Sequence, residues 1–215
     1  SFRFEQGNPE LGTEWALEGR LSLDNGSRSK GWGWKAQAFA ALHRGFISIT
    51  PSAQFAPISH AGQIYEFLAN DAFRTGLEAE VRHIAERQTL SFTGSTLGQW
   101  DLKTGLGLPF TTPSQARFSW EGRTRGGFAV QLSGLALAPA ALTARNEDTT
   151  PGALLADITL SQTTARGQWT LDVSNLFNRA WLDHTSAYRA LGLVSQGRWV
   201  QIRFTTTLKH HQTQE

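Results

Sequence analysis

Side chains that could hold a metal ion lie close together near the C-terminal end of the sequence. Asp183 and His184 are adjacent and follow Trp181, and carboxylate and imidazole groups suit zinc and similar ions. One adjacent pair lacks the remaining ligands of a metal site, so ordinary hydrogen bonding within a loop is the alternative role. We therefore expect neither a bound metal nor another cofactor.

Arginine side chains in the same region could attract an anion. Arg189, Arg198 and Arg203 are the candidates, because a guanidinium group binds carboxylates and similar anions through paired hydrogen bonds. The alternative is that these arginines pair with acids of the protein itself, such as Glu18 or Asp172.

Residues that could carry out catalysis are present without the context that catalysis needs. Glu78 and Glu80 share one face of a segment, but nothing marks them as an acid and a base with separated pKa values. Ser95 and Ser174 lack the surroundings of a hydrolase nucleophile. We therefore expect no enzymatic activity.

All these side chains stand on, or between, segments in which apolar residues occupy every second position. In residues 14–24, Trp15, Leu17 and Leu21 alternate with polar residues, and a period of two is that of a β-strand. Eight further segments repeat the pattern, at 32–43, 73–82, 90–96, 116–121, 128–133, 154–160, 169–173 and 200–208. The sequence predicts an all-β fold of about nine antiparallel strands.

The connections between these strands alternate in length. Short turns are predicted near 25–31, 83–88, 122–127 and 162–167, and long loops at 45–71, 100–114, 138–151 and 176–196. Outer-membrane β-barrels combine short periplasmic turns with long extracellular loops. The pattern therefore indicates a segment of a transmembrane β-barrel.

One face of each predicted strand is unsuited to lipid. An Arg at the middle of the bilayer costs about 2–4 kcal/mol and a carboxylate somewhat less, so the polar face must look into the barrel lumen. The predicted lumen-facing charges are Glu18, Arg20, Lys35, Arg74, Glu78, Glu80, Arg117, Glu121, Asp157, Asp172 and Arg203.

Composition agrees with a barrel and excludes other classes. The chain is 40% hydrophobic with 8 Trp, yet no stretch approaches the roughly 18 consecutive apolar residues of a membrane helix. The net charge of +2 and the scattered Lys and Arg do not suggest nucleic-acid binding. Because the sequence starts at Ser1 and contains no Met, we expect a mature product, a proteolytic piece or a cloned fragment.

A soluble β-sandwich is the alternative fold, since its strands also alternate apolar and polar residues. A sandwich does not require loops that alternate in length. Small residues on the apolar face, such as Ala36, Ala38 and Ala40, would fill a sandwich core poorly but suffice against lipid. The tryptophans mostly fall near predicted strand ends, as in the aromatic girdles of membrane barrels.

Four motifs of the sequence, taken together with their order and spacing, resemble those of the TonB-dependent outer-membrane receptors. The segment at 172–178, Asp-Val-Ser-Asn-Leu-Phe-Asn, followed by His184 and Gly197-Arg198, is similar to the closing signature of that family. The other three motifs are Asn8-Pro9-Glu10-Leu11, Leu108-Pro109-Phe110 with Pro113 and Arg117, and Glu147 to Gly152. Two features depart from the pattern: Gln196 replaces the usual Pro, and a polar tail replaces the usual terminal aromatic residue.

The resemblance covers only the C-terminal part of such a receptor. It implies residues 1–11 as an extracellular loop, 12–208 as barrel strands and 209–215 as a polar tail, which we expect to be solvated and disordered. Large plugged barrels have roughly 22 strands, so nine strands cannot close one. We therefore expect a second chain that supplies the plug domain and the remaining strands and contacts the TonB complex.

The function implied is TonB-energised uptake of a scarce ligand across the bacterial outer membrane, most simply a ferric siderophore or another metal complex. The alternative is a passive porin-like barrel or a structural barrel that acts as a scaffold. The loop residues expected to contact the ligand are His60, Tyr65, Trp181, Asp183, His184, Tyr188 and Arg189.

Overall fold

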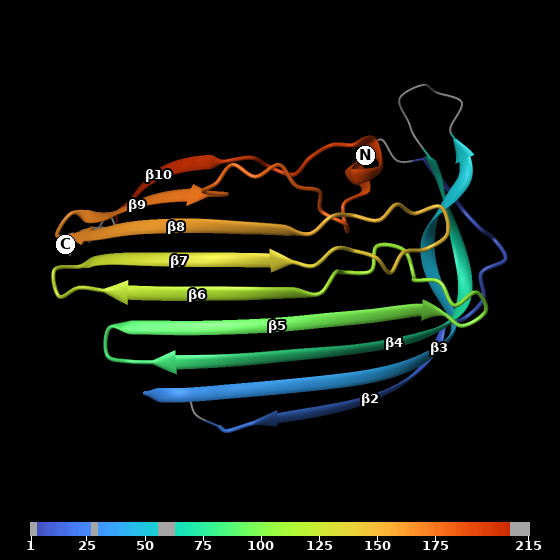
Figure 1. The fold of residues 1–215 in the computed structure, drawn as a ribbon, viewed down its shortest axis with the longest axis horizontal. Coiled ribbons are helices and arrows are strands. Elements are labelled where there is room, and N and C mark those ends of the chain that lie inside the picture. The colour runs from blue at the N-terminus through green and yellow to red at the C-terminus, as the bar shows by residue number, and fades with distance from the viewer. Residues whose placement is uncertain (1–3, 27–29, 56–62, 207–215) are drawn as a thin grey trace, which may run out of the picture.

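A computed structural model describes residues 4–26, 30–55 and 63–206 of the chain. The described residues form ten strands in one sheet and one short 3₁₀ helix at Ala187–Leu191 (Figure 1). The strands are β1 (Phe4–Gln6), β2 (Trp15–Asp24), β3 (Gly31–Phe55), β4 (Gln63–Ile84), β5 (Gln88–Asp101), β6 (Gln115–Arg123), β7 (Phe128–Leu137), β8 (Ala153–Thr164), β9 (Gly167–Ser174) and β10 (Trp199–Thr205).

The sheet is a meander in which every strand from β2 to β10 pairs with its neighbours along the chain. The order is β10-β9-β8-β7-β6-β5-β4-β3-β2, and each of these pairs is antiparallel. The nine predicted strands correspond to β2–β10. The short β1 was not predicted; it pairs in parallel with β4, Phe4 opposite Ile64.

The strand register gathers the large apolar side chains on one face, where they remain exposed. Leu17 lies opposite Leu42, Leu42 opposite Phe73, and Phe73 opposite Trp100, so one row crosses four strands. The exposed members of this apolar face are Trp15, Leu17, Leu21, Leu23, Trp32, Trp34, Leu42, Leu77, Val81, Phe92, Phe118, Phe128, Leu132, Leu154, Trp169, Val200, Ile202 and Phe204. The described strands therefore form a single layer, with no compact core against a second one.

Tryptophans lie toward both ends of the apolar face. Trp15 begins β2 and Trp100 lies near the end of β5, at the end of the sheet that carries the long loops. At the opposite end, Trp34 lies near the start of β3 and Trp169 near the start of β9. This distribution is that of the two aromatic girdles of a membrane barrel.

The short turns and long loops lie where the sequence predicted them, with one exception. Short turns join the strands at one end of the sheet, and the segments 102–114, 138–152 and 175–198 form long loops at the other end (Figure 1). The prediction of a loop at 45–71 is wrong. There β3 and β4 continue as a paired hairpin, from Phe46 opposite Asn70 to Pro51 opposite Tyr65.

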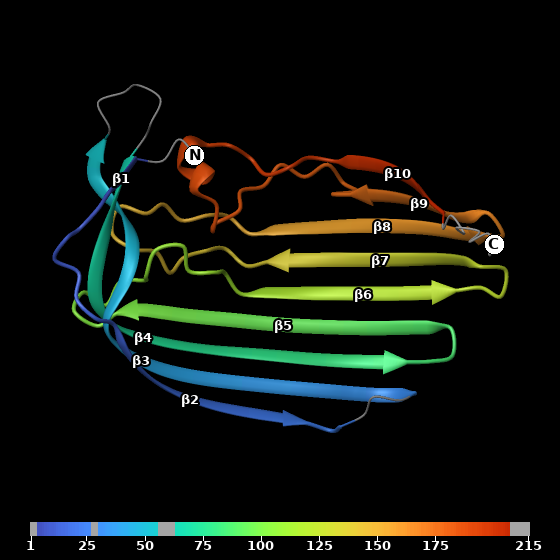
Figure 2. The ribbon, with the colours of Figure 1, turned by 180° about the vertical axis from the view of Figure 1, so that it is seen from behind.

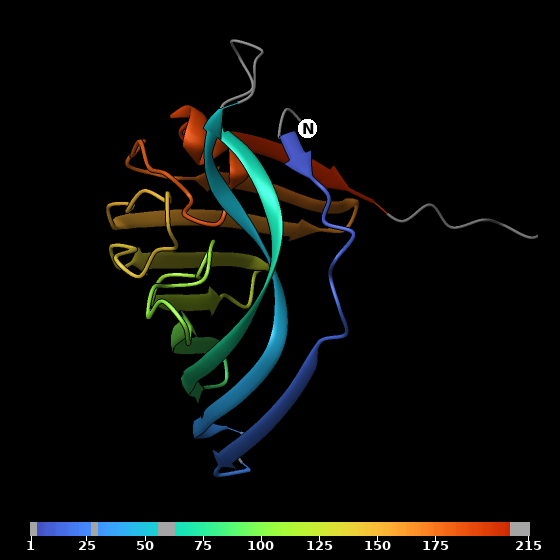
Figure 3. The ribbon, with the colours of Figure 1, turned by 90° about the vertical axis from the view of Figure 1, so that its right-hand side faces the viewer.

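We call this hairpin extension, residues 46–55 and 63–70, the arm. A β-bulge between His43 and Phe46, with Gly45 at φ 64°, precedes it, and bulges bend strands and increase their twist. The arm bends out of the sheet and runs across the loop end of the neighbouring strands (Figures 1 and 3). Its apolar residues alternate well enough to pair as strands, while its Pro, Ser and Asn content concealed this in the sequence.

The N-terminal segment runs along the arm. Pairing between β4 and β5 ends at Ala72, which lies opposite Asp101, the last residue of β5. Residues 63–71 of β4 extend past the end of β5. Beyond that point β1 takes the free edge of β4 (Figure 2), and Asn8 Nδ2 donates to Phe67 O at 3.1 Å. Residues 4–11 therefore lie at the loop end of the sheet.

Burial is concentrated at the loop end. Ala72, Leu108 and Tyr65 are at most 4% exposed, and each lies in the arm, beside it or in the loop next to it. None of the helical residues that the structure describes belongs to a helix long and apolar enough to cross a membrane. The well-packed part of the chain is thus the cap of loops over one end of the sheet.

Candidate functional site

The face opposite the apolar face carries the charges. Register places Lys35 between Asp24 and Glu80 on the neighbouring strands, and Glu78 lies two residues from Glu80 on the same side of β4. All eleven residues predicted to face a lumen fall on this one face: Glu18, Arg20, Lys35, Arg74, Glu78, Glu80, Arg117, Glu121, Asp157, Asp172 and Arg203. We call it the polar face.

Several cations of the polar face pair with acids on the same strand or the next. Arg20 NH2 lies 2.7 Å from Glu18 Oε1, and Arg203 NH2 lies 3.6 Å from Asp172 Oδ2. Both arginine side chains are more than half exposed, so each pair contributes little to stability. For Arg203, the geometry matches the predicted alternative of pairing with Asp172.

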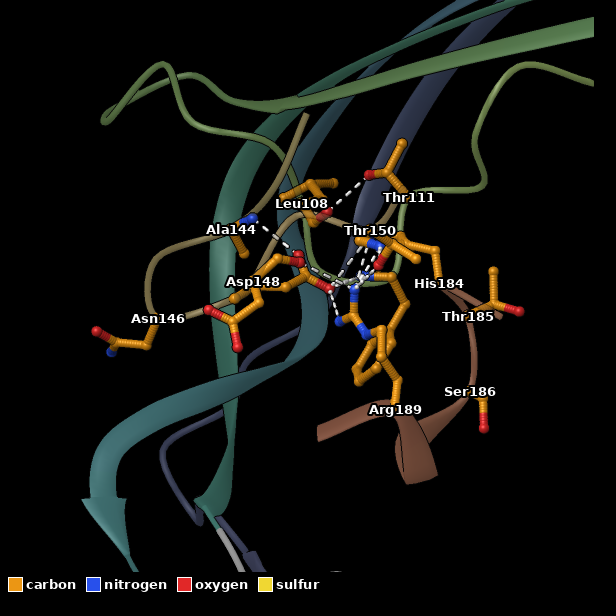
Figure 4. Close-up of polar contacts among 12 residues, drawn as sticks. Leu108, Thr111, Ala144, Asn146, Asp148, Thr150, His184, Thr185, Ser186 and Arg189 are labelled. Atoms are coloured by element: carbon orange, nitrogen blue, oxygen red, sulfur yellow. Dashed lines mark hydrogen bonds and ion pairs between the residues drawn. The ribbon is translucent and has the colours of Figure 1, made fainter. Parts of the chain in front are cut away.

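A buried polar cluster joins the loops at one end of the polar face (Figure 4). Glu147 contacts groups from each of the three loops and so lies at its centre. The Glu147 side chain has no exposed surface. Its Oε1 accepts from Phe110 N and its Oε2 from Ala144 N, both at 2.9 Å, and Arg189 NH2 lies 2.8 Å from Oε1. The carboxylate thereby satisfies backbone donors of two loops and a cation from a third.

Arg189 reaches into the cluster from the 3₁₀ helix (Figure 4). Its NH1 donates to Asp148 O and Thr150 Oγ1, both at 3.1 Å, and also contacts His184 Nδ1. Its guanidinium carbon lies 5.8 Å from the centre of the Phe110 ring, within range of a cation–π contact.

His184 completes the cluster as a neutral group. Its side chain is 1% exposed, and its Nδ1 lies 2.9 Å from Thr150 Oγ1. Burial and the nearby Arg189 charge lower the pKa of His184 below its usual value, and Glu147 and Asp183 oppose this shift without reversing it. Near neutral pH the cluster therefore contains one anion, one cation and an uncharged imidazole.

The arm is fastened to the same cluster. Tyr65 on β4 stacks on Phe110 with 6.0 Å between ring centres. Asn146 Nδ2 donates to Pro51 O at 3.4 Å, and Gln63 Nε2 donates to Asn146 O at 3.3 Å. The three loops and the arm thus form one connected cap.

The closing motif of the sequence organises the last loop. Asn175 adopts a positive φ of 49°, its N–H donates to Asp157 Oδ1 at 2.7 Å, and its Nδ2 donates to Arg179 O and Gln196 O. Asn178 Oδ1 accepts from Arg198 N at 2.9 Å. These contacts hold the two ends of the loop 175–198 together beside β8.

A pocket of about 260 Å³ lies between the last loop and the polar face. Gln115 and Arg117 line it from β6, Leu135 and Leu137 from β7, and Trp181 from the loop. We call it the loop pocket. It combines a cation with apolar walls.

A larger hollow of about 730 Å³ lies between the arm and the loops 102–114 and 138–152. Its charged lining residues are Glu66, Asp101, Lys103 and Arg145. Sequence reasoning named none of these as ligand-contacting residues, because each is an isolated charge with no motif around it.

The predicted ligand-contacting residues divide into separate groups. Tyr65, His184 and Arg189 are engaged in the buried cluster or stacked on it, while Trp181 and Asp183 line the loop pocket. Tyr188 is half-exposed on the 3₁₀ helix. His60 lies outside the described residues.

Asp183 forms hydrogen bonds within its own loop, whereas His184 contacts Thr150 of the loop 138–152. Asp183 Oδ1 accepts from Thr185 N at 2.9 Å and from Thr185 Oγ1 at 2.7 Å. No group of three or more His, Asp or Glu side chains able to hold a metal ion occurs among the described residues. Sequence reasoning missed the central role of Glu147, although its Glu-x-x-Thr-x-Gly motif marked the segment.

Comparisons with known proteins identify the fold. No family model matches this sequence, and no curated protein matches it. The solved structure of the copper transporter OprC matches with a TM-score of 0.76 at 16% identity, over 91% of this chain and 32% of that chain. The FrpB iron transporter from Neisseria meningitidis matches with a TM-score of 0.66 at 13% identity, over 93% of this chain and 32% of that chain.

A third match is the ferric yersiniabactin uptake receptor FyuA from Yersinia pestis, with a TM-score of 0.62, 18% identity and coverage of 88% of this chain and 28% of that chain. These structures are transporters and a receptor, not enzymes. The fold is that of the barrels of TonB-dependent outer-membrane receptors, as the sequence motifs predicted. The chain spans about a third of the length of the structures it matches.

Proposed function

We propose that this chain forms part of the barrel wall of a TonB-dependent transporter in the bacterial outer membrane, and that the transporter takes up a scarce metal complex such as a ferric siderophore. The observation that carries the proposal is the division of the sheet into two faces. One is apolar and exposed along its whole width, and the other carries the charges and the buried loop cluster.

The division of the faces supports contact between the apolar face and lipid. Leu21 and Ile202 are 61% and 71% exposed on the apolar face, a costly arrangement in water because burying apolar surface gains about 25 cal/mol per Å². Arg20 and Arg203 on the other face would each cost about 2–4 kcal/mol at the middle of a bilayer. The apolar face therefore contacts lipid, and the polar face lines the interior.

The two edges of the sheet call for further strands. Among the strands that the structure describes, β2 and β10 end the sheet, so each pairs along one side only. Open edges do not occur in the hydrocarbon of a membrane, because each unpaired backbone group costs several kcal/mol there. We place the remaining strands and a plug domain, which receives the TonB contact, on a second chain.

The proposed ligand class follows from the similarity of this fold to solved structures of metal transporters and a ferric-chelate receptor. The matched structures carry names that include copper, iron and ferric yersiniabactin, which supports a metal complex as the transported ligand. This chain would contribute the wall of the pathway and three of the loops above it.

The first experiment is purification of the native assembly from outer membranes in mild detergent, followed by mass mapping of every co-purifying chain. We expect a partner that contains both strands and a plug-like globular domain. A partner with strands only would favour the passive porin. Recovery of this chain alone as a closed barrel would contradict the proposal.

A transport assay then separates the two barrel functions. We expect uptake of a labelled ferric chelate that is lost when TonB is deleted, and no steady current across a planar bilayer that contains the purified assembly. Steady open conductance together with TonB-independent uptake would support the passive porin instead.

A further inference from the structure

Arg117, like Arg74, is a cation of the polar face that forms no ion pair with a described acid, and it also lines the loop pocket. Its neighbours across the strands are Thr93 and Leu135, both uncharged. Its NH2 donates to Gln115 Oε1 at 3.3 Å, and no ion pair links it to any acid that the structure describes. The guanidinium group therefore retains donors that no carboxylate occupies.

The walls next to Arg117 are apolar, although they lie on the polar face. Leu135 is opposite Arg117 and Leu137 is opposite Gln115, so both side chains point to the same side as the charges. Trp181 from the last loop, Pro113 and Pro151 also line the loop pocket. A flat apolar ring fits such walls, since aromatic rings pack well against one another and against aliphatic side chains.

The acid that lines the loop pocket forms no ion pair with Arg117. Asp183 lines the same pocket, but its Oδ1 is held by Thr185 N and Thr185 Oγ1. The pocket thus combines an unpaired cation, apolar walls and an acid that is turned toward its own loop.

We infer that the loop pocket binds an aromatic acid, with the carboxylate or phenolate on Arg117 and the ring between the β7 leucines and Trp181. A guanidinium fork donates two parallel hydrogen bonds to a carboxylate. The loop pocket has a volume of about 260 Å³. Pockets for drug-sized ligands have volumes of about 300–1,000 Å³, so the loop pocket suits a smaller group, one ring with its acidic substituent.

This inference rests on the proposed function, because it identifies the pocket as a contact for one arm of the transported chelate. It narrows the ligand to chelates that carry an aromatic acid. It also gives Arg117 a role that a purely structural residue of the wall would not have.

The test uses the complete assembly purified from outer membranes, with benzoate as the probe and benzamide as its neutral counterpart of the same shape. Binding is measured by ligand-observed NMR titration. We expect benzoate to bind at least tenfold more tightly than benzamide, because charge-assisted hydrogen bonds exceed neutral ones by about 1.4 kcal/mol or more, a factor of ten.

Variants of two arginines supply the matched comparison. Arg117→Gln is expected to weaken benzoate binding at least tenfold and to leave benzamide binding unchanged, and Arg117→Lys to recover part of the loss. Arg125→Gln, an exposed position in the turn at the opposite end of the sheet, is expected to bind benzoate like the wild type. Heat-modifiable migration on gels checks that each variant assembles.

Three results would overturn the inference: no benzoate binding by the wild type, equal binding of benzamide, or an assembled Arg117→Gln variant that binds benzoate normally. The failure of the proposed function is a separate result. If benzoate binding depends on Arg117 but uptake does not depend on TonB, the loop pocket is supported and the TonB-dependent transporter is rejected. If uptake depends on TonB but benzoate does not bind, the transporter is supported and the loop pocket is rejected as a binding site.

Discussion

At the scale of single residues, Glu147 holds the loop end together. A carboxylate without exposed surface is costly to bury unless it is fully paired. Glu147 meets this condition with two backbone N–H groups and Arg189, which lies 42 positions away in the sequence. The contribution of this residue therefore depends on three loops that reach the same point.

We expect Glu147→Gln to destabilise the loop cap by about 3–5 kcal/mol, because it leaves the buried Arg189 charge without its partner. Limited proteolysis of the assembled protein should show faster cleavage within the loops 138–152 and 175–198. Glu86→Gln, which changes an exposed glutamate between β4 and β5, should be cleaved like the wild type. Equal protection of both variants would show that the ion pair does not hold the loops.

His184 gives the cap a dependence on pH. Because its pKa in the folded state is lowered, mainly by burial and then by Arg189, the unfolded state binds more protons once the pH falls below about 6.5. The stabilisation is therefore complete above that pH and is lost as the pH falls toward the folded-state pKa. Acidification is expected to loosen the loop cap.

We expect loop cleavage by a pH-tolerant protease to accelerate between pH 7.5 and pH 5 in the wild type. His184→Gln should flatten this dependence, since it removes the group that titrates. His83→Gln, at the opposite end of β4, should keep the full pH dependence. The same acid-induced acceleration in His184→Gln would assign the effect to another group.

At the scale of the strands, the alternation of side chains fixes which face each residue occupies. A shift of register by one residue would turn every side chain of a strand to the other face. In β2 this means that Leu21 lies on the apolar face, opposite Ala38, while the adjacent Ser22 lies on the polar face, opposite Gln37. Neighbouring positions of one strand should therefore respond oppositely to charge.

We expect Leu21→Arg to destabilise the membrane-inserted assembly by about 2–4 kcal/mol, because it places a cation against lipid. Ser22→Arg, one residue further along the strand, should cost less than about 1 kcal/mol, since the proposed orientation turns its side chain toward the aqueous interior. Urea titration of the assembly in lipid vesicles, followed by heat-modifiable migration, measures both. Equal effects of the two substitutions would contradict the assignment of the faces.

At the scale of the whole molecule, the two ends of the sheet differ sharply. One end has short turns, and the other carries the arm, the three long loops and the buried cluster (Figures 1 and 2). In barrels of this class the long loops face the outside of the cell. The proposed orientation therefore places Tyr188 outside and Arg125 in the periplasm.

Labelling of intact cells checks this orientation, because the chain contains no native cysteine to interfere. We expect Tyr188→Cys to react with a membrane-impermeant maleimide on whole cells. Arg125→Cys, in the β6–β7 turn, should react only after the outer membrane is permeabilised. The opposite pattern would reverse the orientation, and labelling of both positions would contradict membrane insertion of this sheet.

The sequence by itself determined the nine strands β2–β10, the sorting of residues between two faces and the positions of most connections. These properties follow from a local period of two along the backbone, which a single strand expresses without its neighbours. The same logic failed at 45–71, where paired strands extend as an arm whose alternation is interrupted by the bulge at His43–Phe46.

Only the tertiary structure decided how the loops meet. The joining of Glu147 to Arg189, the stacking of Tyr65 on Phe110 and the position of Arg117 opposite Leu135 in the loop pocket depend on residues that are distant in the sequence. Loop backbones have no repeating period, so spacing could name candidate side chains such as His184 without saying which of them would be buried. The physical reason is that burial and pairing are properties of the folded arrangement, whereas alternation is a property of the chain.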